Sequence, residues 1–310
     1  MTADSAYGEL SDKFGPNCVF GAPASAFTTY KAGGAARALV KPGSAQEFSW
    51  LNRWCAANKL PLRVLGRGSN VLVSDKGLDG VTVLTEKLSS ITFSGPAVTA
   101  EAGASWDDLC REACERGLAG FEKASGIPGS VGGALRMNAG AFGQEAFDKL
   151  VEAEVMRPDG STVRLAKEKL PHGYRSAAGL DGLIVLSAVF ELPRAPKEEL
   201  LAERARILAC RAEKQPLDLP SAGSVFKRPP GDYASRLIDA AGLKGLRLGG
   251  ALVSPKHAGF IVNAGGATAS DIYSLMLKVR AEVLAKTGVR LELEQLLLGE
   301  FPEDKAAAQV

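Results

Sequence analysis

A glycine-rich stretch at residues 125–140 carries the clearest chemical pattern of the chain. It contains five glycines and one proline, and its apolar residues follow neither a helical nor a strand period. Glycine lets a ligand approach the backbone closely, and successive backbone amides bind anions. The stretch therefore predicts a cradle for the phosphates or the ring system of a large cofactor. The alternative is a tight crossing of the chain with a structural role only.

A second glycine loop, at residues 66–70, separates two apolar runs at 62–65 and 71–75. It lacks the third glycine and the helix of a dinucleotide-binding fingerprint, and it lacks the Gly-Lys-Ser/Thr ending of a Walker loop. Its backbone amides, with Ser69 and Asn70, still form a set of donors for a diphosphate. A hairpin turn is the alternative. Two such loops in one chain favour a nucleotide cofactor.

Cysteine and histidine do not form a recognisable site. The five cysteines lack the spacing of a disulfide framework, and Cys110 and Cys114 lie one helical turn apart, far in sequence from His172 and His257. Two thiolates alone do not make a zinc site. We therefore expect buried cysteines and no metal site.

Length and charge limit the function classes. The chain has 310 residues, which suggests two domains or a domain with an added lobe. Its 37 basic and 35 acidic residues give a net charge of +2, so no nucleic-acid partner is implied. The chain shows no secretion signal and no apolar run near the roughly 20 residues that span a bilayer. We expect a cytoplasmic protein with no membrane partner.

Short strands and a few helices surround the glycine segments. Helices are predicted over residues 44–58, 105–116, 197–214, 234–241 and 270–287, and a strand is predicted over 289–298. Pro216 and Pro220 end the charged helix over 197–214 and indicate a domain boundary. Gly288 is the expected C-cap of the last helix.

Motifs spread over residues 26–300 resemble, in order, those of the UDP-N-acetylenolpyruvoylglucosamine reductase (MurB) family. The matching segments are 28–36, 66–70, 120–123, 125–140, 173–176, 220–227, 241–245, 257–263 and 291–294. The resemblance implies an α+β fold, in which a two-lobed FAD-binding domain of the vanillyl-alcohol-oxidase (PCMH) type precedes a smaller α/β substrate domain. Only the charged helix lies between Leu192 and Pro220, as in the shorter family branch that lacks a substrate-capping insertion.

The implied domain organisation has five parts. They are an N-terminal extension at 1–25, the FAD-binding domain at 26–195 with lobes at about 26–85 and 86–195, a linker helix at 196–219, the substrate-binding domain at 220–302 and a tail at 303–310. We expect the protein to be a monomer.

The resemblance also implies a reaction, the NADPH-dependent and FAD-mediated reduction of UDP-N-acetylglucosamine enolpyruvate to UDP-N-acetylmuramate for peptidoglycan synthesis. Hydride addition to the methylene carbon of the enolpyruvyl ether pushes negative charge toward the carboxylate. That charge needs a cationic or hydrogen-bonding group already in place, and the neighbouring carbon then needs a proton. By resemblance, Arg175 binds the carboxylate or enolate, Ser224 donates the proton, and Glu294 holds the enol form or assists proton delivery.

The resemblance assigns ligand-binding residues as well. For FAD they are Gly66, Arg67, Gly68, Ser69 and Asn70 of the shorter loop, and Ser125, Gly126, Ile127, Pro128, Gly129, Ser130, Gly133, Asn138 and Ala139 of the longer stretch. For the UDP-sugar substrate they are Tyr174, Lys227 and Arg228, and our hypothesis for Arg228 is a contact with the diphosphate.

Some positions depart from the usual family motifs. Where Glu-Pro-Glu-Val is common near the C-terminus, this chain has Glu292, Leu293, Glu294 and Gln295. We favour Glu294 as the functional carboxylate because it occupies the second Glu position. Leu252 replaces a common glutamine, position 177 is alanine where many members have serine, and residue 228 is arginine where a variant motif has asparagine.

Two other functions stay open. One is an FAD-dependent alcohol or sugar oxidase of the same fold, although such oxidases often tether FAD through a His or Cys near a cradle, and here the nearest cysteine, Cys114, lies on a predicted helix. The other is a non-catalytic homologue that binds FAD or a UDP-sugar. The joint presence of Arg175, Ser224 and Glu294 argues against that second function.

Overall fold

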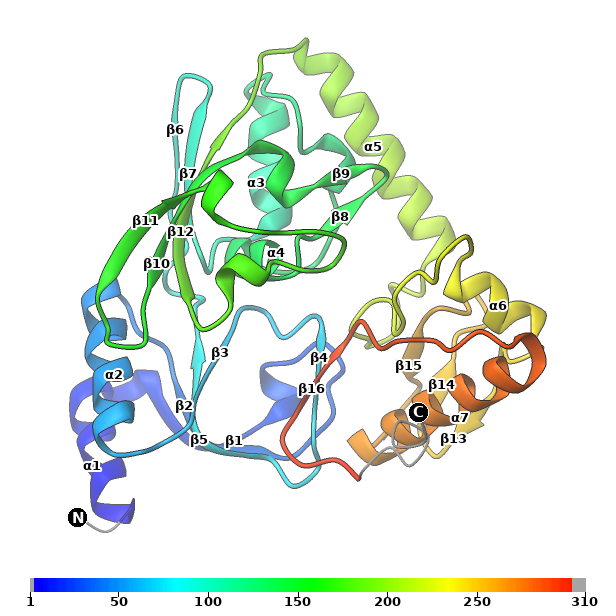
Figure 1. Ribbon diagram of the computed structural model, residues 1–310, viewed down its shortest axis with the longest axis horizontal. Helices are drawn as coiled ribbons and strands as arrows, with labels where there is room; N and C mark the ends of the chain where they lie inside the picture. Colours follow the sequence, from blue (N-terminus) through cyan, green and yellow to red (C-terminus); the bar gives the residue numbers. More distant parts are fainter. Residues whose placement is uncertain (1–2, 303–310) are drawn as a thin grey trace. The chain divides into compact units, whose positions relative to one another are not determined.

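The computed structural model describes residues 3–302, with side chains from residue 7 onward, and it divides into two compact units (Figure 1). Unit 1 comprises Met1–Phe20, Ala38–Arg67 and Gly80–Arg211, and unit 2 comprises Gly21–Arg37, Gly68–Asp79 and Ala212–Val310. The predicted tail at 303–310 lies outside the described residues. The five-part domain division of the sequence analysis stays a prediction.

A five-stranded antiparallel sheet forms the centre of unit 1, in cyan and green in Figure 1. Its order is β11 (Thr162–Ala166), β10 (Leu150–Met156), β12 (Ile184–Glu191), β7 (Ala97–Glu101) and β6 (Ile91–Ser94). Helices α3 (Trp106–Glu115) and α4 (Val131–Arg136) share its core, together with the short hairpin β8 (Gly140–Ala141) and β9 (Gln144–Glu145) nearby. The rings of Trp106, Phe121 and Phe190 meet there, with centroids 4.9 Å apart for the first two and 5.2 Å for the last two.

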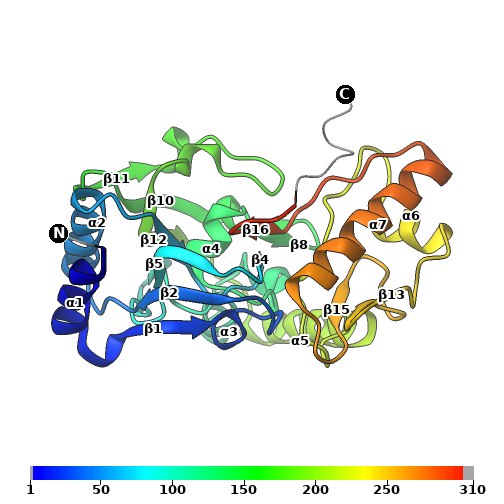
Figure 2. The same ribbon diagram turned by 90° about the horizontal axis from the view of Figure 1, so that it is seen from below.

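A second core of unit 1 lies under the N-terminal helices. Helices α1 (Ala3–Phe14) and α2 (Ala45–Ala57) lie together in both views (Figures 1 and 2). The predicted extension at 1–25 contains α1, in which Tyr7, Leu10 and Phe14 recur at helical spacing and are buried in this core. The four-stranded sheet of the N-terminal region has the order β1 (Cys18–Pro23), β2 (Ala35–Val40), β5 (Leu78–Leu84) and β3 (Leu62–Leu65).

Unit 2 is built on helix α7 (Ala269–Thr287), which packs on a small antiparallel sheet (Figure 2). The sheet has the order β13 (Arg247–Leu248), β14 (Ala251–Val253) and β15 (Ile261–Asn263), and α6 (Ala234–Ala240) contacts α7. A parallel pair joins β4 (Val71–Val73) to β16 (Leu296–Leu298). This pair brings the second glycine loop, which precedes β4, beside the C-terminal motif, which precedes β16.

Local caps explain why most helices lie where the sequence predicts them. Ser44 accepts a hydrogen bond from the Glu47 N–H at the start of α2, and a capping box joins Thr268 and Asp271 at the start of α7. Gly288, with φ of 72°, ends α7 as predicted. Helix α5 occupies Lys197–Lys214, so the predicted charged helix is confirmed. Short 3-10 helices occupy Gly15–Asn17, Ala24–Ala26, Glu122–Ala124, Ala146–Lys149, Lys167–Lys169 and Ala178–Leu180.

Two sequence expectations were wrong. The strand predicted over 289–298 is regular only in β16, because the residues before it bond to the loop at 222–227. The glycine-rich stretch contains helix α4, although no helical period was visible in it. Among residues 3–302, no helix has the length and apolarity needed to cross a membrane.

Candidate functional site

The glycine-rich stretch lies in unit 1 and is held by its own residues at its centre. Ser130 accepts a hydrogen bond from the Gly133 N–H at 3.3 Å and so caps α4. Val131, Ala134 and Leu135 are buried on one face of this helix. Before it, Pro128 is exposed and Ile127 and Gly129 are half-buried. The segment before the cap therefore presents backbone and few side chains to a ligand, as a cradle requires.

A charged pair fixes the start of the stretch. Asp107 Oδ1 accepts the Gly126 N–H at 2.6 Å, and Arg204 on α5 donates two hydrogen bonds to the Asp107 carboxylate at 2.7 and 2.9 Å. Burial acts to raise the Asp107 pKa, but the bonds from Arg204 and Gly126 outweigh it and lower the pKa. Gly126 has φ of 75°, and a Cβ there would lie 2.8 Å from Leu208 Cδ2. We call Asp107, Arg204 and Gly126 the charged brace.

The two glycine loops meet within unit 1. A Cβ on Gly66 would lie 2.1 Å from Ser130 Oγ, so only glycine permits this approach. Arg67, the next residue, is exposed. Gly68, Ser69 and Asn70 belong to unit 2, where Gly68 packs against the backbone at Phe27 and Thr28.

The end of the glycine-rich stretch is tied to the segment that carries Arg175. Asn138 is fully buried, and its side chain bonds to Glu145, to the Gly173 carbonyl and to the Phe147 N–H. The Asn138 N–H also donates to the Leu135 carbonyl at 3.0 Å, so any hydrogen bond to a cofactor would be accepted by the Asn138 carbonyl. Ala139, next in sequence, donates its N–H to the Ala134 carbonyl at 2.7 Å.

Arg175 lies at the tip of a tight turn beside this stretch. Gly173 and Ser176 exchange backbone hydrogen bonds, and Arg175 has φ of 53°, an uncommon conformation for a side chain other than glycine. Its Nη2 donates to the Gly140 carbonyl at 2.9 Å, and its Cζ lies 5.0 Å from the centre of the exposed Tyr174 ring. Arg175 is thus placed at the end of the predicted cofactor cradle.

Ser224 and Glu294 come together within unit 2. The Glu294 N–H donates to the Val225 carbonyl at 2.8 Å, and the Lys227 N–H donates to the Glu292 carbonyl at 2.9 Å. Asn70 Nδ2 donates to the Glu294 carbonyl at 3.2 Å. Three segments of the chain therefore lie side by side here. They are the second glycine loop, the loop of Ser224 and the segment of Glu294.

The remaining predicted substrate residues line the outer part of this loop. Lys227 Nζ lies 3.4 Å from Glu292 Oε2, and the two residues form an exposed ion pair. Arg228 is exposed, with its guanidinium carbon 4.4 Å from the centre of the Tyr233 ring.

The sequence analysis missed Gln295 as a contributor to the site and treated it only as a departure. Gln295 is 3% exposed and bonds to Tyr30 and to the backbone just before Ser224. The available signal was a polar residue directly before the apolar run at 296–298.

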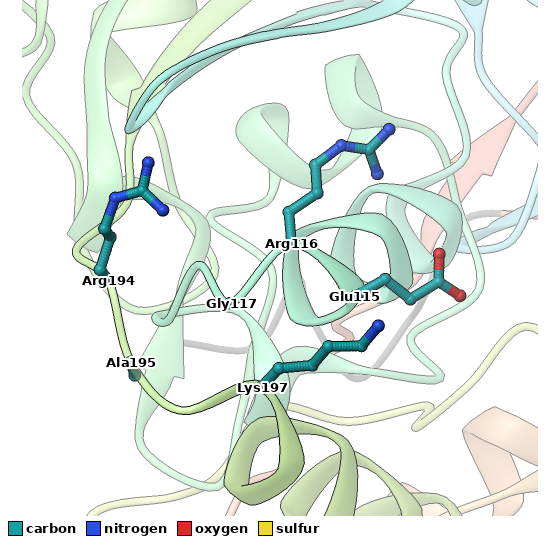
Figure 3. Close-up of a pocket in the computed structure, with 6 residues that line it drawn as sticks. All are labelled: Glu115, Arg116, Gly117, Arg194, Ala195 and Lys197. Carbon is teal, nitrogen blue, oxygen red and sulfur yellow. The ribbon is translucent and has the colours of Figure 1, made fainter.

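A cavity of about 370 Å³ opens elsewhere on unit 1 (Figure 3). It is lined by Glu115, Arg116, Gly117, Arg194, Ala195 and Lys197, none of which is a predicted site residue. Arg116 already pairs with Glu112 at 3.1 Å and covers the Phe93 ring. This cationic cavity shares no lining residue with the cradle or with the turn of Arg175.

The cradle has features that fit a large cofactor. Ser125 Oγ, at its base, is buried and makes no hydrogen bond within the described part of the chain. Gly66 and Gly126 are held where a Cβ would collide with neighbouring atoms. A buried polar atom without a partner costs free energy unless a group from outside satisfies it.

Comparison with known proteins identifies both parts of the chain. Residues 36–166 match a family model described as an FAD binding domain, and residues 215–298 match the C-terminal domain of UDP-N-acetylenolpyruvoylglucosamine reductase. The reductase of Listeria innocua is 44% identical over 279 residues, which cover 90% of this chain and 94% of that protein. The Clostridium botulinum reductase is 44% identical over 87% of this chain and 90% of its own length.

Comparison with solved structures gives the same family. The reductase (MurB) of Thermus caldophilus matches with a TM-score of 0.80 and 36% identity, over 91% of this chain and 98% of that chain. An alkyldihydroxyacetonephosphate synthase matches with a TM-score of 0.50 and 16% identity, over 63% of this chain and 41% of its own, a likeness of fold alone. The predicted fold class, an FAD-binding domain of the vanillyl-alcohol-oxidase type followed by a smaller substrate domain, is confirmed.

Proposed function

The chain belongs to the UDP-N-acetylenolpyruvoylglucosamine reductase family, and on that premise we propose how its residues divide the work of the reaction. The protein is a flavin-dependent oxidoreductase that reduces UDP-N-acetylglucosamine enolpyruvate with FAD. NADPH is the proposed reductant and UDP-N-acetylmuramate the proposed product. One hydride and one proton are added across the carbon–carbon double bond.

The two glycine segments hold the cofactor in this proposal. Backbone amides before the Ser130 cap, and those of the loop at 66–70, bind its phosphates, while Ser125 Oγ supplies a further polar contact. The charged brace keeps Gly126 in the conformation that binding needs. The bound flavin, once reduced by NADPH, would supply the hydride to the methylene carbon.

Arg175 binds the carboxylate of the enolpyruvyl group. A guanidinium has five N–H donors in a plane and binds a carboxylate through two of them. The bond from Arg175 Nη2 to Gly140 supports this role because it fixes the side chain before substrate arrives. Its positive charge is then in place when negative charge develops on the carboxylate oxygens.

Ser224 donates the proton to the carbon that bears the ether oxygen. A serine hydroxyl is a weak acid, so it needs a neighbouring group that assists proton movement. The observation that carries this assignment is the 2.8 Å bond from the Glu294 N–H to the Val225 carbonyl, which places Glu294 beside the Ser224 loop. Glu294 holds the enol form or returns a proton to Ser224. Lys227 and Arg228, on the same loop, bind the UDP-sugar.

We infer further that the enzyme is a cytoplasmic monomer. The five cysteines are all free thiols, as proteins of a reducing compartment have.

Turnover with the purified protein tests the proposal. We expect NADPH consumption that depends on UDP-N-acetylglucosamine enolpyruvate and a product heavier by two hydrogens, whereas UDP-N-acetylglucosamine, the control, supports none. NADPH consumption that does not depend on the enolpyruvate but does depend on the oxygen concentration would favour the oxidase. Bound FAD without any turnover would favour the non-catalytic homologue.

A further inference from the structure

Gln295 lies buried directly behind the Ser224 loop. Its Nε2 donates to the carbonyls of Ala222 and Gly223 at 3.0 and 3.1 Å, and its Oε1 accepts from the Tyr30 hydroxyl at 2.9 Å. Both carbonyls can only accept, so the amide nitrogen must face them and the amide oxygen must face Tyr30. The three bonds therefore fix the amide in one orientation.

These bonds restrain the two residues that precede Ser224. Gly223 has φ of 76°, in the left-handed region that glycine adopts readily. A glycine samples a broad set of backbone angles when nothing holds it. The bonds from Gln295 to the carbonyls of Ala222 and Gly223 help to hold it here.

The residue after Ser224 is restrained from the same segment. The Val225 carbonyl accepts the Glu294 N–H, and the Val225 N–H donates to the Gly259 carbonyl at 2.9 Å. Ser224 is thus bracketed by bonds from two consecutive residues, Glu294 on one side and Gln295 on the other. One short segment carries both the assisting carboxylate and the amide that orients the proton donor.

Tyr30 completes the arrangement from the far side of Gln295. Its side chain is fully buried, and burial raises the pKa of its hydroxyl, so the group stays a neutral donor. The Tyr30 carbonyl accepts from Asn263 Nδ2 at 3.0 Å, which fixes the backbone at Tyr30 to β15. All four side-chain contacts of this network lie within unit 2. We call Gln295 and Tyr30 the neutral brace.

We propose that Gln295 is a positioning residue for the protonation step, which acts by holding the Ser224 hydroxyl in line with the substrate carbon. The inference rests on the proposed role of Ser224. Because a misplacement of about 1 Å costs up to a hundredfold in rate, loss of the two carbonyl bonds slows protonation without removing the proton donor. Binding of FAD and its reduction by NADPH do not need this loop geometry.

The test is single-turnover kinetics on the holoenzyme with Gln295→Met, which keeps the side-chain length but removes the amide. We expect flavin reduction by NADPH at the wild-type rate. Hydride addition is reversible until the neighbouring carbon is protonated, so slower protonation should slow net reoxidation by the enolpyruvate roughly 10- to 100-fold. Gln215→Met is the matched control, because Gln215 Oε1 is buried without a partner among the described residues and lies outside the site. It should leave both rates unchanged.

A cycle with Ser224→Ala separates positioning from general damage. In the Ser224→Ala background there is no hydroxyl left to position, so Gln295→Met should slow reoxidation by less than twofold more. An equal 10- to 100-fold loss in both backgrounds, or reoxidation of Gln295→Met at the wild-type rate, would overturn the proposal. If Gln295→Met does not fold, Tyr30→Phe removes only the bond to Gln295 Oε1 and should slow reoxidation severalfold. If the reduced wild-type enzyme is not reoxidised by the enolpyruvate at all, that result contradicts the proposed function itself and not only the role of Gln295.

Discussion

The charged brace of unit 1 and the neutral brace of unit 2 both restrain a loop at the proposed site, but through different kinds of hydrogen bond. Each fixes a glycine beside a functional group, Gly126 at the start of the cradle and Gly223 just before Ser224. In unit 1 the contact is a carboxylate paired with an arginine, and in unit 2 it is an amide with a buried phenol.

The difference in charge between the two braces fits the chemistry proposed for the loop that each one restrains. A fixed charge shifts the pKa of its neighbours, which matters beside a group that must release a proton. The neutral brace adds no charge next to Ser224. In our proposal the charged brace lies behind a loop that binds FAD through backbone amides and transfers no proton, so a strong ionic contact carries no such cost there.

The largest effect is expected in unit 2 from loss of the proton donor. Ser224→Ala should slow reoxidation of the reduced flavin by the enolpyruvate about 10²- to 10⁴-fold, the usual range for a general acid, with unchanged reduction by NADPH. Stopped-flow absorbance of the two half-reactions measures this. Ser221→Ala, on the same loop, is the control. Equal slowing of both half-reactions would remove Ser224 from the protonation step.

Breaking the charged brace should act on the cofactor instead. Arg204→Met removes the two guanidinium hydrogen bonds to the half-buried Asp107 carboxylate, which should lower the free energy of unfolding by about 2 kcal/mol and weaken FAD binding roughly tenfold. Urea denaturation and flavin titration measure the two quantities. Arg206→Met, which breaks the exposed pair with Glu203 on the same helix, should change each by less than about 0.5 kcal/mol. Similar losses for both variants would show that the brace has no special role.

The stabilising effects of the two braces should depend on pH in opposite directions. The Asp107 pKa is lowered in the folded protein, so its contribution is complete above the ordinary carboxyl value of about 4 and is lost as pH falls further. The Tyr30 pKa is raised, so its contribution is complete below about 10 and is lost as pH rises. The stability difference between wild type and Arg204→Met should therefore shrink only at low pH, and that between wild type and Tyr30→Phe only at high pH. Unfolding free energies across the pH range measure both, and a loss of the Arg204 effect at high pH would contradict this account.

The smallest effect concerns substrate affinity at the exposed edge of unit 2. If Arg228 contacts the diphosphate, Arg228→Ala should raise the substrate KM about fivefold, the equivalent of about 1 kcal/mol, at constant kcat. Steady-state kinetics measures this, with Arg236→Ala as the control because its exposed side chain pairs with Asp232. An unchanged KM would remove the diphosphate contact.

The sequence predicts the elements whose signals are local. Ser44 and Gly288 mark the ends of α2 and α7 through bonds within a few residues, and both helices lie where expected. Helix α4 escaped prediction because six residues are too few to show a period among so many glycines. The two glycine loops were found because glycine itself is the signal.

The contacts behind the site could not be predicted in the same way. Gln295 and Tyr30 are 265 residues apart, and Asp107 and Arg204 are 97 apart, so no local pattern connects them. The resemblance to the family, more than the residue types, predicts which residues face the reaction, and those roles stay predictions. The residues that hold them became visible only in the folded chain.

Anaerobic reoxidation of the NADPH-reduced wild-type enzyme tests the central claim most directly. Addition of UDP-N-acetylglucosamine enolpyruvate should restore the visible flavin absorbance within one turnover and yield one equivalent of UDP-N-acetylmuramate. A reduced flavin that stays bleached with the enolpyruvate and recovers only when oxygen is admitted would contradict the account.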